Sequence, residues 1–128
     1  MKNGLLRVLV VNANDSIVVE KKQTLPITLS VNGQLISGEL ISRSEFFTLE
    51  QNVILKHHID IIDAQIVEEK GEIPETPMDE LQYLHLKNAA YWVNGVKVPS
   101  SQTSIIVNID SVDAFNLGML QSCLLYTS

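Results

Sequence analysis

The sequence predicts a mostly β, α+β fold: a small bent antiparallel barrel of five short strands, with an N-terminal helix and an inserted helix. Two Asn-Gly dipeptides, at 32–33 and 94–95, each follow a strand-like run, which is typical of β-hairpins. One stretch between them changes to the three- and four-residue apolar spacing of a helix. With 128 residues, 45% of them hydrophobic, the chain is long enough for one domain with a real core.

The N-terminal segment has apolar residues at helical spacing, namely Leu5, Leu6, Leu9 and Ala13. The turn-forming residues 12–15 end this stretch. A short helix is therefore predicted, although the β-branched run at 8–11 fits a strand equally well. The run at 17–19 is read as a second short β-branched piece.

The first hairpin is the clearest local prediction. Leu25–Val31 alternates apolar and polar residues, and Pro26 stands at its start, where a missing N–H costs least. Asn32-Gly33 suits a type I′ turn, in which both central residues need positive φ. Gln34–Ser42 is then the returning strand, and Gly38 within it marks a bulge or bend.

The next segment, residues 44–63, is predicted to be a helix that frays beyond its last residue. One face carries residues three or four positions apart: Phe46, Leu49, Val53, His57 and Ile61, with Ile54 beside them. Because adjacent residues cannot share one helical stripe, we expect either Phe46 or Phe47 to be partly exposed. The apolar face is expected to pack onto the barrel, with docking of a partner as the alternative.

The second half of the chain supplies the remaining strands. We predict a solvated loop at 68–79, strands at 81–93, 104–109 and 114–119, a loop at 99–102 and a tight turn at 110–111. Residues 1–120 then form a single domain, in which 25–43 and 81–119 are the barrel strands and 44–80 the insertion. Residues 121–128, which include Cys123, are expected to be an unstructured tail.

The acidic charge is concentrated in the insertion. The formal net charge is -6, but residues 45–80 hold ten acidic and two basic side chains, so they carry −8 and the rest carries +2. An acidic chain disfavours nucleic acid and anionic membranes as partners. No apolar run reaches the ~20 residues of a membrane-spanning helix. Without an export signal, a single cysteine indicates a cytoplasmic protein.

No catalytic, cofactor or metal site is predicted, and the protein is not expected to be an enzyme. The chain has no Gly-x-Ser-x-Gly elbow, and His85, in the middle of a strand, is read as structural. His57 and His58, with Asp60 and Asp63, are the one cluster that could hold a metal. Too few of these side chains share one helix face for a four-ligand site.

Candidate residues for contact with a partner come from the insertion and from one strand. They are Phe46, Phe47, Leu49, Val53 and Trp92. Trp92 could stack a nucleobase, but core or interface packing is the favoured role because no basic run accompanies it.

Two groups of motifs, in the order of the chain, resemble the gas vesicle accessory protein U (GvpU-like) family. The first group is Ile27-Thr-Leu-Ser-Val-Asn-Gly33, Leu35-Ile-Ser-Gly-Glu-Leu-Ile-Ser42 and Glu45-Phe-Phe47. The second is Tyr83-Leu-His-Leu-Lys-Asn88, Pro99-Ser100 and Val112-Asp-Ala-Phe-Asn-Leu-Gly118. The resemblance implies a cytoplasmic, non-enzymatic protein that assembles or clusters gas vesicles. Its partners would be gas vesicle proteins and further copies of itself, contacted through open barrel edges and the inserted helix.

A fainter likeness, in the first hairpin and in Leu86-Lys-Asn-Ala89, is to Sm-like (SH3-like) barrels. It implies five strongly bent strands that assemble into rings through open edges. The acidic insertion replaces the loop that binds RNA in that family, and Asp110–Leu117 lacks the Arg-Gly of its second signature. An Sm-like oligomeric RNA-binding module is therefore the alternative function, with Lys87 and Lys97 of each subunit as its basic patch.

Overall fold

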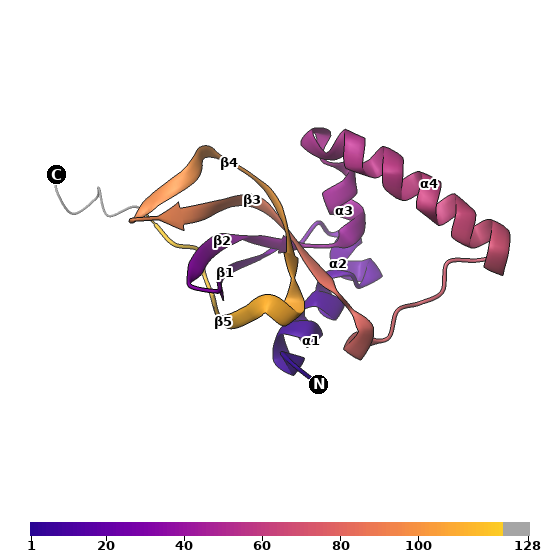
Figure 1. The fold of residues 1–128 in the computed structure, drawn as a ribbon, viewed down its shortest axis with the longest axis horizontal. Coiled ribbons are helices and arrows are strands. Elements are labelled where there is room, and N and C mark those ends of the chain that lie inside the picture. The colour runs from indigo at the N-terminus through magenta and orange to yellow at the C-terminus, as the bar shows by residue number, and fades with distance from the viewer. Residues whose placement is uncertain (122–128) are drawn as a thin grey trace.

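The computed structural model describes residues 1–121, which contain a five-stranded sheet and several helices (Figure 1). The helices are α1 (Gly4–Ala13), α2 (Ser16–Glu20), α3 (Arg43–Thr48) and α4 (Val53–Lys70). The strands are β1 (Leu25–Val31), β2 (Gln34–Ile41), β3 (Tyr83–Val93), β4 (Val96–Asn108) and β5 (Val112–Leu117). Short 3-10 turns lie at Glu50–Asn52, Met78–Glu80 and Ile109–Ser111.

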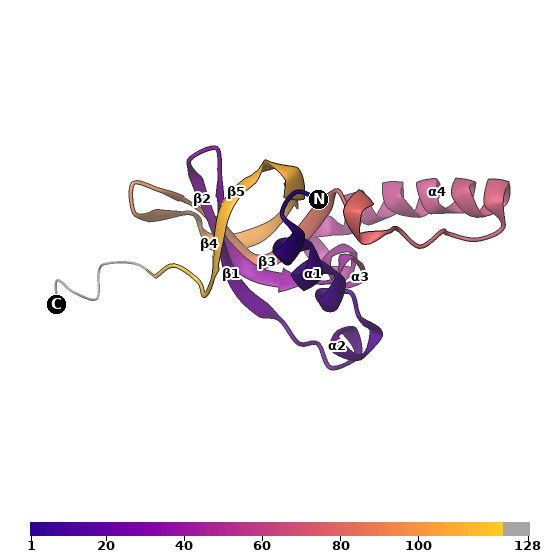
Figure 2. The ribbon, with the colours of Figure 1, turned by 90° about the horizontal axis from the view of Figure 1, so that it is seen from below.

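The sheet has the order β4-β3-β2-β1-β5, and every neighbouring pair is antiparallel. The predicted α+β fold, with five bent antiparallel strands, a leading helix and an inserted helical segment, is confirmed. Within residues 1–121 the sheet stays open, with β4 and β5 at its edges. Leu6 and Val10 of α1 are buried against Ile27 and Leu29 of β1, so α1 covers the main core (Figure 2).

The first hairpin forms as predicted, since Asn32 and Gly33 both have positive φ, at 51° and 83°. Gly38 lies at the predicted irregularity, where the register of β2 against β3 shifts between Ser37 and Glu39. A Cβ atom on Gly38 would stand 2.6 Å from the Cβ of Ala89, so only glycine fits against β3 at this point.

The N-terminal segment is helical in both of its parts. Residues 4–13 form α1, which settles the choice between helix and strand. The β-branched residues 17–19 lie in the short helix α2, although such residues favour a strand. The Asp15 side chain accepts a hydrogen bond from the N–H of Ile17 and so caps the first turn of α2.

The last two strands differ from their predicted limits. The predicted loop at 99–102 falls within β4, but it is an irregular stretch of that strand. Val98 pairs with Tyr91 and Thr103 with Ala89, so residues 99–102 have no register partner in β3, and Gln102 has a positive φ of 67°. Pro99 is tolerated there because β4 is an edge strand, whose outer N–H groups have no partner strand. β5 begins at Val112 and ends at Leu117, whereas the prediction placed it at 114–119.

The predicted helix at 44–63 is two helices. The helical backbone breaks at Leu49, whose extended ψ of 139° ends α3, and α4 then continues to Lys70. Three residues of the predicted loop at 68–79 are therefore helical. Gly71, with a φ of 82°, terminates α4 in the left-handed conformation that favours glycine.

Candidate interaction surface

A small aromatic cluster anchors α3 to the sheet. Phe46 is 1% exposed and Phe47 is 9% exposed, and both pack with Ile41 in a second core beside the main one. The rings of Phe46 and Phe47 lie 5.0 and 5.9 Å from the His85 imidazole of β3. The expectation that one phenylalanine is partly exposed is wrong. The two side chains need not share a helical stripe, because α3 is short and contacts neighbours on more than one side.

Polar contacts orient α3 at both ends. Ser42 caps the helix by accepting the N–H of Glu45 at 3.0 Å, and the Glu45 carboxylate receives Lys87 Nζ from β3 at 2.6 Å. At the other end, the buried Asn52 donates to the Phe46 carbonyl at 2.8 Å, and Ser104 Oγ of β4 lies 3.0 Å from its Oδ1. These contacts place the start of α4. The sequence pattern missed Asn52, and a cap signal would not have revealed its role, because its side chain makes no capping hydrogen bond to α4.

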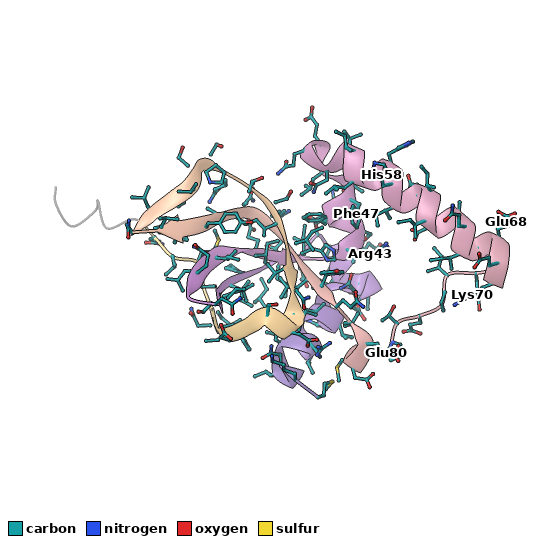
Figure 3. The ribbon with its side chains drawn as sticks, in the orientation of Figure 1. Arg43, Phe47, His58, Glu68, Lys70 and Glu80 are labelled. Atoms are coloured by element: carbon teal, nitrogen blue, oxygen red, sulfur yellow. The ribbon has the colours of Figure 1, made fainter. Side chains whose placement is uncertain are left out.

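A cavity of about 660 Å³ lies where α3, α4, the segment before β3 and the sheet meet. Arg43 and Phe47 from α3 and Glu80 from the returning segment are among its lining residues (Figure 3). His85 also lines it, and burial, together with the positive charge of Arg43, lowers the pKa of this histidine to about 4. The imidazole is therefore neutral near pH 7. Within the described residues it packs against the two phenylalanine rings and makes no side-chain hydrogen bond.

The predicted contact residues do not form one exposed patch. Phe47, Leu49 and Val53 line a second hollow, of about 380 Å³, at the junction of α3 and α4. Only Val53 is largely exposed, at 66%, while Leu49 packs partly against the aromatic cluster. Phe46 and Phe47 are buried and offer little exposed surface, although Phe47 lines both hollows.

Trp92 lies near the far end of β3 from His85, away from the aromatic cluster. It is 9% exposed and stands between Leu35 of β2 and Lys97 of β4 in the sheet register. This burial agrees with the packing role favoured from the sequence and leaves little ring surface for a base to stack on.

The surface that the structure adds is α4 itself. Against the rest of the described chain, residues 1–121, this 18-residue helix has no buried residue. Six of its apolar side chains are classed as exposed: Val53, Ile54, Leu55, Ile61, Ile62 and Val67. Figure 1 shows α4 projecting from the sheet, connected through α3 at one end and through an extended segment at the other. The expectation that the apolar face packs onto the barrel is wrong except for a few side chains near α3.

The other polar candidates take up different roles. The exposed His57 and His58 rings stack 5.7 Å apart, and within residues 1–121 no group of three or more His, Cys, Asp or Glu side chains is placed to bind a metal. Lys87 is engaged with Glu45, so its ammonium is not free for the basic patch that the RNA-binding alternative needs. Cys123 lies outside the described residues. None of the helices described is long and apolar enough to cross a membrane.

Comparison with known proteins places the chain in a family. No curated protein and no solved structure matches it. The model of the family described as "Gas vesicle protein GvpU-like" matches residues 5–120, which is nearly the whole sequence. That range includes the hairpin, the α3–α4 insertion and all five strands described above. The chain therefore belongs to the GvpU-like family of gas vesicle proteins.

Proposed function

We propose that this protein is a non-enzymatic, cytoplasmic accessory protein that associates with gas vesicles and promotes their assembly or clustering through protein–protein contacts. Family membership supports the association with gas vesicles. The exposed apolar helix α4 supports a role in contact, because soluble proteins seldom leave clustered aliphatic side chains in water without a binding purpose.

The candidate site favours binding over catalysis. The neutral His85 packs against Phe46 and Phe47 and has Arg43 as its neighbouring charge. A histidine base normally has a carboxylate or a carbonyl to orient its ring, and in the described residues His85 has neither as a hydrogen-bond partner. The open edges at β4 and β5 offer a second kind of contact, with further copies of the chain.

Flotation of vesicles tests this function directly. Gas vesicles from cells that lack the gene are mixed with the purified full-length chain and floated, and the buoyant fraction is assayed for the protein. Microscopy then scores vesicle clusters. We expect co-flotation and more or larger clusters. A protein that stays in the lower fraction and leaves clustering unchanged would contradict the proposal.

A substitution at the one exposed residue predicted for partner contact refines the test. Val53→Asp introduces a charge into a surface position that is 66% exposed, so the fold should tolerate it. Gln51→Asp adds the same charge at a nearby exposed position and is the matched control. If Val53 contacts the vesicle or a bound partner, only Val53→Asp should reduce co-flotation.

A further inference from the structure

Helix α4 has two unequal sides. Ile59, Asp63 and Ile66 are its half-buried residues, and they mark the side turned toward the rest of the protein. Asp63 lies 3.8 Å from Arg43 of α3, and Ile59 packs beside the aromatic cluster. All other residues of α4 are exposed, so the opposite side of the helix is open to solvent.

The open side carries a stripe of four exposed aliphatic side chains with polar ones between them, which we call the outer face. Ile54, His58, Ile61 and Gln65 follow one another at intervals of four, three and four residues, with Leu55 and Ile62 beside them. The exposed fractions of the four aliphatic side chains are 72% for Ile54, 43% for Leu55, 45% for Ile61 and 49% for Ile62. At 1.5 Å per residue the aliphatic part, from Ile54 to Ile62, is about 12 Å long, just over two helical turns. This matches the anchor spacing by which one helix packs against another.

Charge determines which partner fits the outer face. Glu68 and Glu69 lie at its C-terminal end, and the segment from 53 to 80 holds eight acidic and two basic residues. Lys56 pairs with Asp60 on another side of the helix. Figure 3 shows Lys70 on a different side of the helix end from Glu68. The face therefore combines aliphatic groups with negative charge and has no lysine or arginine within it.

Three kinds of partner can be compared on these terms. A second α4 has no lysine or arginine on its own outer face, so in neither orientation could that face neutralise Glu68 and Glu69, and anionic lipid would be repelled. A helix with aliphatic residues on one side and Lys or Arg beside them would bury the stripe and neutralise the two glutamates.

We propose that the outer face of α4 is a docking site for a basic amphipathic helix of a partner protein. This inference adds the chemistry of the partner to the function proposed above. It rests on that function only for the partner's association with gas vesicles. Apolar anchors at the centre of the stripe supply the affinity, and the glutamates at its end set the preference for a basic partner.

Binding of two model peptides to the full-length protein tests this chemistry. Both are fluorescein-labelled 20-residue amphipathic helices with the same leucine face, and their polar faces carry either lysine or glutamate. Fluorescence anisotropy gives the affinities. We expect the lysine peptide to bind at least about tenfold more tightly than the glutamate peptide. Equal affinities, or no binding of the lysine peptide, would overturn the proposal.

Variants locate the binding on the outer face. Ile61→Asp should lower the affinity for the lysine peptide at least about tenfold, whereas Val67→Asp should change that affinity by less than about twofold. Val67 is the matched control because it lies on the same helix, off the stripe, and its exposure of 43% is close to the 45% of Ile61. Circular dichroism verifies that both variants stay folded. Equal effects of the two substitutions would contradict a site on this face.

Charge reversal separates a specific site from general attraction to an acidic protein. Glu68→Lys with Glu69→Lys changes the charge at the outer face, and Glu72→Lys with Glu75→Lys makes the same change in the adjoining segment. Only the first pair of substitutions should lower the affinity for the lysine peptide by about tenfold or more. Equal losses for both pairs would show non-specific attraction and overturn the proposal.

Flotation distinguishes this proposal from the broader function. If the wild-type chain does not float with vesicles, the gas vesicle role fails, whatever the peptides show. If the wild-type chain and the Ile61→Asp variant float equally well, the role stands and the outer face is not the vesicle-docking site. Loss of flotation in Ile61→Asp but not in Val67→Asp supports both.

Discussion

Lys87 Nζ on β3 lies 2.6 Å from Glu45 Oε2 on α3, so an ion pair joins the sheet to the first helix of the insertion. The two side chains come from motifs that lie before and after α4 in the chain, Glu45-Phe-Phe47 and Tyr83-Leu-His-Leu-Lys-Asn88. Their contact brings together the two halves of the sequence. The pair holds the first turn of α3 against β3.

A double-mutant cycle measures this contact. Both side chains are partly shielded, with 25% and 18% exposure, so we expect Lys87→Met and Glu45→Gln to show a coupling free energy of about 1 kcal/mol. Urea denaturation of the wild type, both single variants and the double variant gives the value. Strictly additive losses would mean that the ion pair contributes nothing to the stability of the fold.

Gly38→Ala should destabilise the sheet. The new methyl group would lie 2.6 Å from Ala89 Cβ and 3.0 Å from Ala89 Cα, so β2 or β3 must shift. We expect a loss of about 2–3 kcal/mol in the free energy of unfolding, typical of an overpacked site. Adding Ala89→Gly makes room for the methyl group and should recover part of that loss. No recovery in the double variant would rule out the steric explanation.

Arg7 is a buried cation whose removal should be costly. Its guanidinium, 3% exposed, donates to the carbonyls of Lys2, Met78 and Leu81 and to the Asp110 carboxylate. Arg7→Met leaves these carbonyls without their donor, and we expect a loss of about 3 kcal/mol in unfolding free energy.

The control for Arg7 is the partner carboxylate. Asp110 is 61% exposed, so Asp110→Asn should cost less than about 1 kcal/mol. Thermal or urea unfolding of the two variants compares the losses. If they are equal, the ion pair and not the carbonyl contacts accounts for the role of Arg7.

The stability of the protein should fall in acid partly because of His85. Its pKa is lowered from 6.5 to about 4 in the folded protein, first by burial and then by Arg43. The unfolded chain therefore binds a proton between pH 6.5 and 4 that the folded chain excludes. The contribution of His85 is complete above pH 6.5 and is lost as the pH falls toward 4, by up to about 3 kcal/mol.

Replacement of the histidine isolates this effect from other titrating groups. Urea unfolding at pH 7.5 and 4.5 gives, for the wild type and for His85→Gln, the change in the free energy of unfolding between the two pH values. The variant should lose less stability between these pH values than the wild type does. Equal losses would show that His85 does not contribute to the acid sensitivity.

Local rules of backbone geometry explain why much of the sheet could be predicted. Asn32-Gly33 and Asn94-Gly95 permit positive φ at two successive residues, so each specifies a tight turn wherever it lies in the chain. The alternation from Leu25 to Val31 matches the burial of Ile27 and Leu29, because side chains of a strand point alternately to its two faces.

The insertion shows where such rules stop. An apolar spacing of three and four residues ran from Phe46 to Ile61 and predicted one helix, but α3 and α4 are separate. The break is held by the hydrogen bond of Asn52 to Phe46, six residues away, and by that of Ser104 to Asn52, which joins residues 52 positions apart. No helical periodicity contains that information.

The sequence by itself determined the two hairpins, the presence of five strands, the acidic insertion and the resemblance to the gas vesicle family. Each of these depends on neighbouring residues or on short motifs. Only the tertiary structure decided which apolar side chains are covered. It buried Phe46, Phe47 and Trp92, and it left Ile54 and Ile61 of α4 exposed. The physical reason is that burial depends on what a distant segment places against a side chain, and no segment within residues 1–121 covers the outer face of α4.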